Sequence, residues 1–198
     1  MKKLSDFTDE ELALAYAEGD NKAFDLLLSR NQTKLFSYIL FVVRDREKAE
    51  DVFQETFVKV ISKLQQGRYI TSGKFSAWLI RIAHNVIMDS YRERKLEKII
   101  ETPDDNNLAN IRGSELLELN IENRYVNDQV LRDVRKIMNL LPTSQREVVY
   151  MRYYQQLSFK EIAECTNVSI NTALGRMRYA ILNMRRMART QELNMELY

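Results

Sequence analysis

The chain has 198 residues, a formal net charge of +2 at neutral pH, and 45% hydrophobic residues. This length allows one or two small domains with adequate cores, and the apolar content is ordinary for a soluble protein. The single cysteine and single histidine exclude an internal disulfide framework, a cysteine-rich zinc site and a histidine cluster for metal or triad chemistry.

The charges are spread unevenly along the chain. Residues 67–100 have seven basic and three acidic side chains, and residues 129–198 have eleven basic and six acidic ones. Between these blocks, residues 101–128 have seven acidic side chains against two basic ones. Two basic blocks separated by an acidic one indicate two surfaces for a polyanion, spaced by a linker.

The amino-terminal stretch lacks the pattern of a signal peptide, because acidic residues occur before any apolar core develops. The longest apolar run, residues 35–43, is too short to span a bilayer. We therefore expect a cytoplasmic protein with no direct membrane insertion. Five glycines and two prolines, among many good helix formers, indicate a mostly helical chain.

Thr8 and Glu11 form a capping-box pattern, which predicts a first helix over about residues 9–18. Its expected apolar face consists of Leu12, Leu14 and Ala15. Asp20 can cap a second helix, and a turn at residues 44–45 leads to a third helix over about residues 46–64.

The outer face of the third helix is acidic and includes Glu47, Glu50, Asp51, Gln54 and Glu55. Asp51 and Glu55 lie four residues apart, a spacing that allows metal binding or acid–base chemistry. No third ligand or nearby histidine accompanies this pair. A solvated or protein-binding acidic face is therefore the favoured interpretation, and we expect no metal and no cofactor.

Residues 65–74 are predicted to form a loop that contains Arg68 and Lys74, and a fourth helix follows over about residues 75–96. The polar face of this helix has four members: Asn85, Asp89, Arg92 and Arg94. We expect Trp78 in the core and His84 at the surface or half-buried.

Residues 97–125 are acidic and rich in turn-forming residues, which predicts a linker. A helix over about residues 126–140 comes next and ends at Pro142. Ser144 and Glu147 form a second capping-box pattern, which predicts a helix over residues 145–154.

Residues 158–186 read as two helices joined by a tight turn. Ser158 and Glu161 predict a helix from residue 159, the run 165–169 breaks it, and Ser169 caps a helix from residue 170. The outward face of this last helix consists of Asn171, Thr172, Gly175, Arg176, Arg178 and Tyr179. Such a pair of helices with a basic outer face can enter a DNA major groove, and an ordinary helical hairpin is the alternative.

Three stretches together resemble bacterial RNA polymerase sigma factors of the extracytoplasmic-function (ECF) type. Residues 51–57 are similar to the family segment D-x-x-Q-E-x-F. Residues 75–92 are similar to F-x-x-W-L-x-x-I-A-x-N-x-x-x-D-x-x-R, and residues 141–186 to the carboxy-terminal helix-turn-helix pattern. The three lie in the family's order, with the linker between the second and third.

The resemblance implies an all-α fold of two small helical domains joined by a flexible linker. Residues 1–96 are then sigma domain 2, residues 97–125 the acidic linker, and residues 126–198 sigma domain 4 with a short tail. It also implies a promoter-specificity subunit, not itself an enzyme, whose partners are core RNA polymerase, promoter DNA and an anti-sigma factor.

Site residues follow from the same resemblance, group by group. The clamp of the largest polymerase subunit would bind Asp51, Gln54 and Glu55. The minus-ten element would be held by Arg68, Lys74, Asn85, Asp89, Arg92 and Arg94. The minus-thirty-five element would be read by Asn171, Thr172, Gly175, Arg176, Arg178 and Tyr179.

Two other functions compete with this interpretation. A stand-alone helix-turn-helix regulator accounts for residues 126–198 but leaves the acidic face and basic loop of the amino-terminal half without a role. A DNA-processing enzyme that uses Asp51 and Glu55 with a metal lacks further ligands and a nucleophile.

Overall fold

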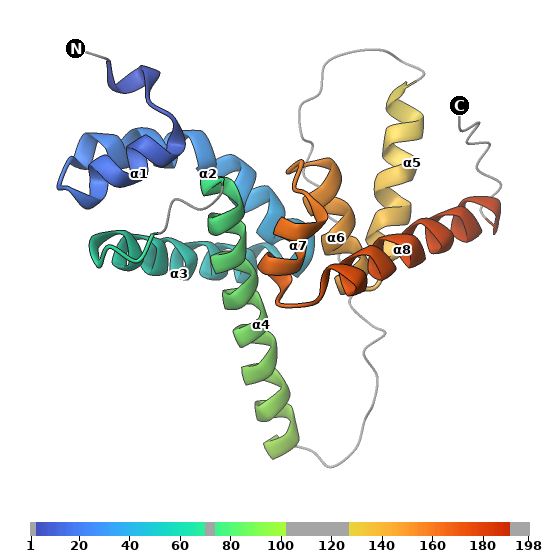
Figure 1. Cartoon of the computed structure of the whole chain (residues 1–198). Coiled ribbons are helices and arrows are strands. Elements are labelled where there is room, and N and C mark those ends of the chain that lie inside the picture. The colour runs from blue at the N-terminus through green and yellow to red at the C-terminus, as the bar shows by residue number, and fades with distance from the viewer. Residues whose placement is uncertain (1–2, 70–73, 102–126, 191–198) are drawn as a thin grey trace. The chain divides into compact units, whose positions relative to one another are not determined.

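The computed structural model describes residues 3–69, 74–101 and 127–190, with the side chains of residues 94–101 and 127–133 outside that description. Within these ranges every regular element is a helix (Figure 1). The chain divides into two compact units, the first with η1 and α1–α4 and the second with most of α5–α8. The predicted all-α fold of two helical domains is confirmed.

The first unit is built from one short 3-10 helix and four α-helices. Their bounds are η1 Leu4–Asp6, α1 Asp9–Ala17, α2 Asn21–Val43, α3 Arg46–Gln65 and α4 Phe75–Glu101. Helix α1 packs against α2, α3 and α4, and α2, α3 and α4 pack pairwise on one another. The largest fully buried side chains of this core are Leu12, Leu27, Leu35, Tyr38, Ile39, Leu64, Phe75 and Ile87.

The helix starts of this unit follow the predicted caps. Thr8 and Glu11 form the reciprocal capping box at the start of α1, and Asp20 accepts from two backbone N–H groups at the start of α2. Arg44 adopts a left-handed conformation (φ 63°) at the turn before α3. Local polar side chains therefore set where these helices begin.

Three predictions for this unit are wrong. Leu14 is 44% exposed, because α1 buries the stripe of Leu12, Ala13 and Tyr16 instead. His84 is buried, with 6% exposure, where a surface or half-buried side chain was expected. Helix α4 continues to residue 101, since no helix breaker occurs before Pro103.

The second unit contains the helix-turn-helix. Its elements are α5 Asn127–Leu140, α6 Thr143–Tyr153, α7 Phe159–Thr166 and α8 Ile170–Thr190. Helix α8 packs against α5 and α6. The core includes Ile137, Met151, Leu157, Ile162, Ala173 and Met177.

The start of α6 differs from the prediction. The helix begins at Thr143, with Pro142 at the N-cap and no side-chain capping bond. The carbonyl oxygen of Pro142 accepts from the N–H groups of Gln145 and Arg146, so Ser144 lies inside the helix. Glu147 is 2% exposed and does not form the predicted capping box. The fixed backbone angle of proline sets this boundary instead of a hydroxyl cap.

A membrane-spanning helix requires both sufficient length and apolar character. Among the residues that the structure describes, no helix is both long and apolar enough to cross a bilayer.

Candidate functional site

Two hydroxyl caps and one left-handed residue set the starts of α7 and α8 and the turn between them. Ser158 Oγ accepts from the Glu161 N–H at 3.2 Å, and Glu161 Oε2 accepts from the Ser158 N–H at 2.7 Å. Helix α7 continues through Thr166, two residues beyond the predicted break. Asn167 then adopts φ 55°, a conformation that asparagine tolerates better than most residues.

The start of α8 is capped by Ser169. Its Oγ accepts from the Thr172 N–H at 3.0 Å and lies 2.8 Å from the Thr172 hydroxyl. The Thr172 side chain is therefore already engaged at the cap. A short helix, a tight turn and a capped longer helix form the predicted helix-turn-helix.

The outer face of α8 presents most of the predicted contact residues. Asn171, Thr172, Arg178 and Tyr179 are exposed, with Tyr179 at 62%, whereas Gly175 and Arg176 are partly buried. Ile170, the first residue of α8, is also exposed, at 46%. Ile170 lies in the first turn of α8, next to the capping residue Ser169.

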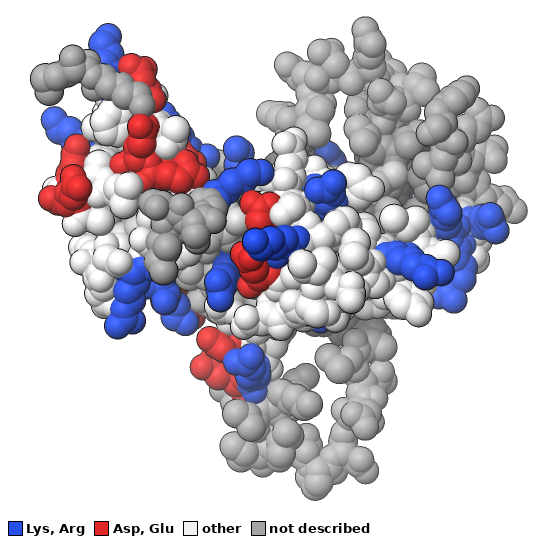
Figure 2. Space-filling view, viewed as in Figure 1, with Lys and Arg blue, Asp and Glu red and all other residues white. Residues whose placement is uncertain are grey.

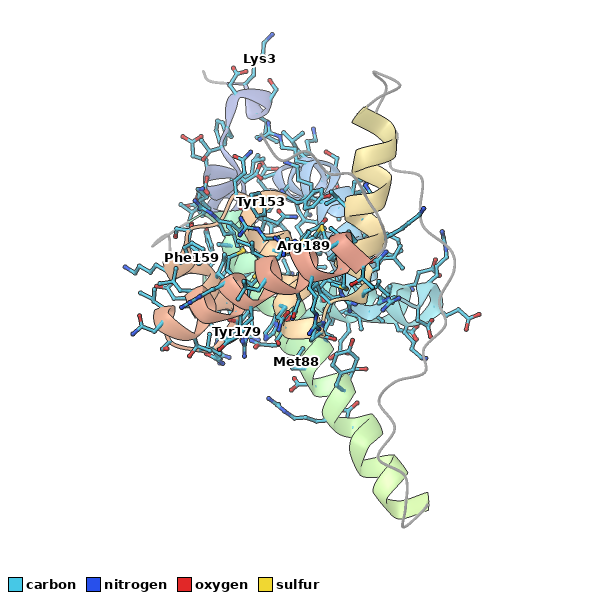
Figure 3. All side chains as sticks on the ribbon, turned by 90° about the vertical axis from the view of Figure 1, so that its right-hand side faces the viewer. Lys3, Met88, Tyr153, Phe159, Tyr179 and Arg189 are labelled. Carbon is cyan, nitrogen blue, oxygen red and sulfur yellow. The ribbon has the colours of Figure 1, made fainter. Side chains whose placement is uncertain are left out.

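A longer stripe continues from this face to the end of α8. Positions 171, 175, 178, 182, 185 and 189 recur at helical spacing, and all except Gly175 are exposed. Arg185, Arg186 and Arg189 are exposed basic residues that the sequence interpretation did not include. Figure 2 shows basic side chains gathered over the C-terminal end of α8, and Figure 3 labels Tyr179 and Arg189 along this helix.

Gly175 lies in the middle of α8 with open space around it. A Cβ atom added there would meet no heavy atom within 4 Å. Packing inside this protein therefore does not require glycine at this position. Glycine in a helix interior costs about 1 kcal/mol relative to alanine, so Gly175 lowers the stability of α8.

The acidic face of α3 is exposed as predicted. Asp51, Gln54 and Glu55 all lie at the surface of the helix, and Val58 on the same face is 67% exposed. Positions 51, 54, 55 and 58 follow i, i+3, i+4, i+7 spacing, so one apolar side chain lies among polar ones. The sequence interpretation missed Val58, because a lone valine reads as core.

Ion pairs connect this acidic face to the polar face of α4. Lys59 Nζ lies 2.7 Å from Glu55 Oε1 and 4.0 Å from Asp89 Oδ2. Arg92 Nη1 lies 2.8 Å from Asp89 Oδ1. Each of these side chains is partly exposed, so each pair contributes little to stability and can exchange partners.

The remaining minus-ten candidates lie on α4 and on the connection before it. Arg68, Lys74 and Asn85 are exposed. Arg81 is exposed one turn before Asn85 on the same face, and the sequence interpretation did not include it. The side chain of Arg94 lies outside the described residues.

An aromatic cluster lies where α4 begins. The Tyr69 ring packs edge-on against Phe75 and Trp78, at centroid distances of 5.7 and 5.0 Å. Trp78 is half-buried in this cluster. Burial, with the nearby carboxylates of Glu10 and Asp9, raises the pKa of Tyr69 to about 12, so its hydroxyl stays neutral.

Metal chemistry finds little support in the described part of the chain. There, no group of three histidine, cysteine or carboxylate side chains is placed to hold a metal ion. Asp51 and Glu55 accordingly have no third ligand among the described residues.

Comparisons with known proteins match both units. The family model for Sigma-70 region 2 matches residues 27–97, and that for Sigma-70, region 4 matches residues 131–176. The ECF RNA polymerase sigma-E factor of Escherichia coli K12 is 30% identical over 183 residues, covering 89% of this chain and 93% of that protein. The RNA polymerase sigma-H factor of Pseudomonas aeruginosa is 29% identical over 173 residues, covering 85% and 88%.

Two solved structures share the fold. The sigma factor RpoE, in complex with the anti-sigma factor NepR from Bartonella quintana, has a TM-score of 0.62 and 20% identity, covering 85% of this chain and 98% of that one. CnrH, in complex with the cytosolic domain of CnrY, has a TM-score of 0.62 and 23% identity, covering 92% and 97%. At these identities the likeness establishes the fold alone.

Proposed function

The chain belongs to the bacterial RNA polymerase sigma factors of the ECF type, and from that membership we propose which of its surfaces perform each step of promoter recognition. As a sigma factor, it directs promoter-specific initiation by RNA polymerase, and its family is not catalytic by itself. The alternative of a stand-alone helix-turn-helix regulator is not favoured, because region 2 matches the half of the chain that this alternative leaves unused.

The first proposed surface is the acidic face of α3, which docks on the clamp of the polymerase's largest subunit. Its exposed members are Asp51, Gln54, Glu55 and Val58. Carboxylates steer and orient a basic protein partner, and an exposed valine among them supplies apolar contact area. The carboxylates of Asp51 and Glu55 repel nucleic acid, which separates this surface from the DNA-binding ones.

The second proposed surface lies on α4 and the connection before it, and it engages the minus-ten element. Its exposed members are Arg68, Lys74, Arg81, Asn85 and Arg92, and the half-buried Asp89 lies among them. Arginine and lysine hold the strand backbone, whereas Asn85 and Asp89 offer hydrogen bonds to an extruded base. Arg94 is assigned to this surface from the sequence resemblance alone.

The third proposed surface is the outer face of α8, which reads the minus-thirty-five element in the major groove. Asn171, Thr172, Gly175, Arg178 and Tyr179 are the contact positions, and Arg176 supports base or phosphate contacts. A 21-residue helix is about 31 Å long, so its last turns extend beyond the base edges. Arg185 and Arg189 therefore contact phosphates.

An anti-sigma factor is a further proposed partner. The sigma factor RpoE, which has the same fold, was solved in complex with the anti-sigma factor NepR, and CnrH was solved in complex with the cytosolic domain of CnrY, each at a TM-score of 0.62. Because the protein acts with RNA polymerase, we place its site of action in the cytoplasm. The domain boundaries given by the sequence resemblance, 1–96 and 126–198, remain part of this proposal.

One observation supports the whole assignment best. An exposed acidic face on α3 and an exposed basic face on α4 lie on neighbouring helices, joined by Lys59 between Glu55 and Asp89. A protein that binds only DNA gains nothing from the acidic face of α3. A protein that bridges polymerase and promoter DNA needs both the acidic face of α3 and the basic face of α4.

Footprinting on selected genomic fragments tests the assignment. Fragments bound by the protein with core polymerase are sequenced, and protection is mapped with each component alone and with both together. We expect protection of two elements, near minus thirty-five and minus ten, only with both together. Specific protection of one duplex site by the protein alone would contradict the proposal and support an operator-binding regulator.

A further inference from the structure

Helix α1 holds both ends of the segment that joins α3 to α4. At one end, Gln65, the last residue of α3, donates from Nε2 to the Tyr16 hydroxyl at 3.1 Å. At the other end, the N–H of Phe75, the first residue of α4, donates to Glu10 Oε1 at 2.9 Å. Figure 1 shows α1 beside the C-terminal end of α3, and α1 also packs on α4.

Helix α1 is itself fixed to α2 by polar contacts at its amino end. Asn31 Nδ2 donates to Asp9 Oδ2 at 2.8 Å, and Arg30 Nη1 lies 3.3 Å from Asp9 Oδ1. Arg30 also donates to the carbonyl oxygens of Ser5 and Phe7, each at 2.7 Å. Asn31 is 5% exposed, so this anchor lies in the body of the unit. Glu10, one residue along, is thereby held at a fixed place.

The two contacts fit their partners chemically. The first N–H groups of a helix have no intrahelical partner and form the positive end of its dipole, so a carboxylate at Phe75 stabilises the start of α4. Burial acts to raise the pKa of Glu10, but hydrogen bonds from the N–H groups of Phe75 and Glu10 and from Thr8 outweigh it and lower the pKa. The Tyr16 ring packs on Phe24, with centroids 4.6 Å apart, which fixes its hydroxyl.

We propose that Glu10 and Tyr16 are positioning residues for capture of the melted minus-ten strand. They act through the ends of the connection that contains Arg68 and Lys74 and do not touch DNA themselves. Because Gln65, three residues before Arg68, and Phe75, next to Lys74, are held beforehand, Arg68 and Lys74 need less positioning when the strand binds. The inference rests on the proposed role of Arg68 and Lys74.

The test compares variants that each remove one contact with variants that keep it. Glu10→Ala removes the carboxylate, and Tyr16→Phe removes only a hydroxyl and keeps the packed ring. Glu10→Gln keeps an oxygen that accepts from Phe75. Glu18→Ala is the matched control, an exposed carboxylate at the other end of the same helix.

The probe is a fluorescent single-stranded oligonucleotide with the non-template minus-ten sequence of a promoter mapped with the wild-type protein. Its affinity is measured for holoenzyme assembled from each full-length variant and core polymerase. Affinity for core polymerase, affinity of the holoenzyme for minus-thirty-five duplex and the melting temperature are measured alongside.

We expect Glu10→Ala and Tyr16→Phe each to weaken oligonucleotide binding about fivefold to tenfold, the factor that one net hydrogen bond is worth. Glu10→Gln recovers most of the loss, and Glu18→Ala leaves binding unchanged. Core and duplex affinities stay at the wild-type value in all four variants.

The inference is overturned if both variants bind the oligonucleotide like the wild type, or if core affinity falls in parallel with oligonucleotide affinity. If Glu10→Ala does not fold, the oligonucleotide affinities of Tyr16→Phe and Glu10→Gln decide whether the inference holds. Wild-type holoenzyme that cannot distinguish the minus-ten oligonucleotide from a scrambled one contradicts the proposed function, and the inference falls with it.

Discussion

Arg92 and Asp89 form an ion pair one turn apart on α4, with Arg92 Nη1 2.8 Å from Asp89 Oδ1. Both belong to the proposed minus-ten surface, and the carboxylate offsets part of the positive charge that Arg92 presents to a phosphate. Asp89 also lies 4.0 Å from Lys59. The carboxylate thus weakens the attraction of two cations for single-stranded DNA.

Replacing Asp89 with asparagine should relax sequence discrimination at this surface. The change removes a negative charge and frees Arg92, so we expect holoenzyme to bind scrambled single-stranded DNA severalfold more tightly than the wild type does. Minus-ten and scrambled oligonucleotides should become harder to distinguish in a competition assay. Arg92→Ala should weaken the binding of both oligonucleotides. It should also reduce the slope of log affinity against log salt concentration by about 0.7. Weaker binding of scrambled DNA by Asp89→Asn would contradict this account.

Charge reversal on α3 should disrupt polymerase binding without unfolding the protein. Glu55→Lys opposes the basic partner proposed for this face, so we expect core affinity to fall at least about tenfold at low salt, since like charges across an interface cost several kcal/mol. Asp25→Lys, an exposed carboxylate on α2, is the matched control and should bind like the wild type. Titration of labelled core polymerase measures both.

Substitution of Val58 tests the apolar contact of the α3 face separately from the charge of that face. Its side chain is 67% exposed, so Val58→Ala should change the free energy of unfolding by less than about 0.5 kcal/mol. Core affinity should nevertheless fall severalfold, and this loss should not depend on salt, unlike that of Glu55→Lys. An unchanged core affinity would remove Val58 from the proposed surface.

Gly175→Ala should affect stability and DNA binding in opposite directions. A Cβ meets nothing within 4 Å, so the variant should gain about 1 kcal/mol in the free energy of unfolding from helix propensity. The added methyl group would separate α8 from the groove, and affinity for minus-thirty-five duplex should fall. Urea unfolding and duplex titration test the two effects, and a variant that gains in both would show that Gly175 is not at the DNA surface.

The lowered pKa of Glu10 predicts a pH-dependent contribution to stability. A carboxyl group whose pKa is lower in the folded chain than its ordinary 4.5 stabilises the fold above that value. The contribution is lost as the pH falls through the lowered pKa. The difference in urea midpoint between wild type and Glu10→Gln should therefore be largest near neutral pH and shrink below about pH 4.5. A difference that grows in acid would contradict the assigned hydrogen bonds.

Local signals in the sequence predicted much of the fold. The pairs Thr8 with Glu11 and Ser158 with Glu161 form capping boxes as expected, and Ser169 caps α8. Such caps act within one helical turn, so residue type and spacing suffice to find them. The same signal was wrong at Ser144, where the neighbouring Pro142 determines the start of α6.

Contacts between distant residues were beyond what spacing can predict. The bond from the Phe75 N–H to Glu10 joins residues 65 positions apart, and Glu10 reads in the sequence as an ordinary first-turn carboxylate. The burial of His84, at 6% exposure, is likewise not encoded in a local pattern. Val58 and Arg189 were missed for the same reason, since exposure depends on which face of each helix the rest of the fold covers.

Run-off transcription tests the central claim most directly. Purified core polymerase is incubated with fragmented genomic DNA from the source bacterium, with and without the protein. We predict new discrete transcripts that depend on the protein, with start sites that follow two shared promoter elements. Glu55→Lys should abolish them, and Asp25→Lys should not. If no transcript depends on the protein while it binds duplex DNA tightly by itself, the sigma-factor account is contradicted.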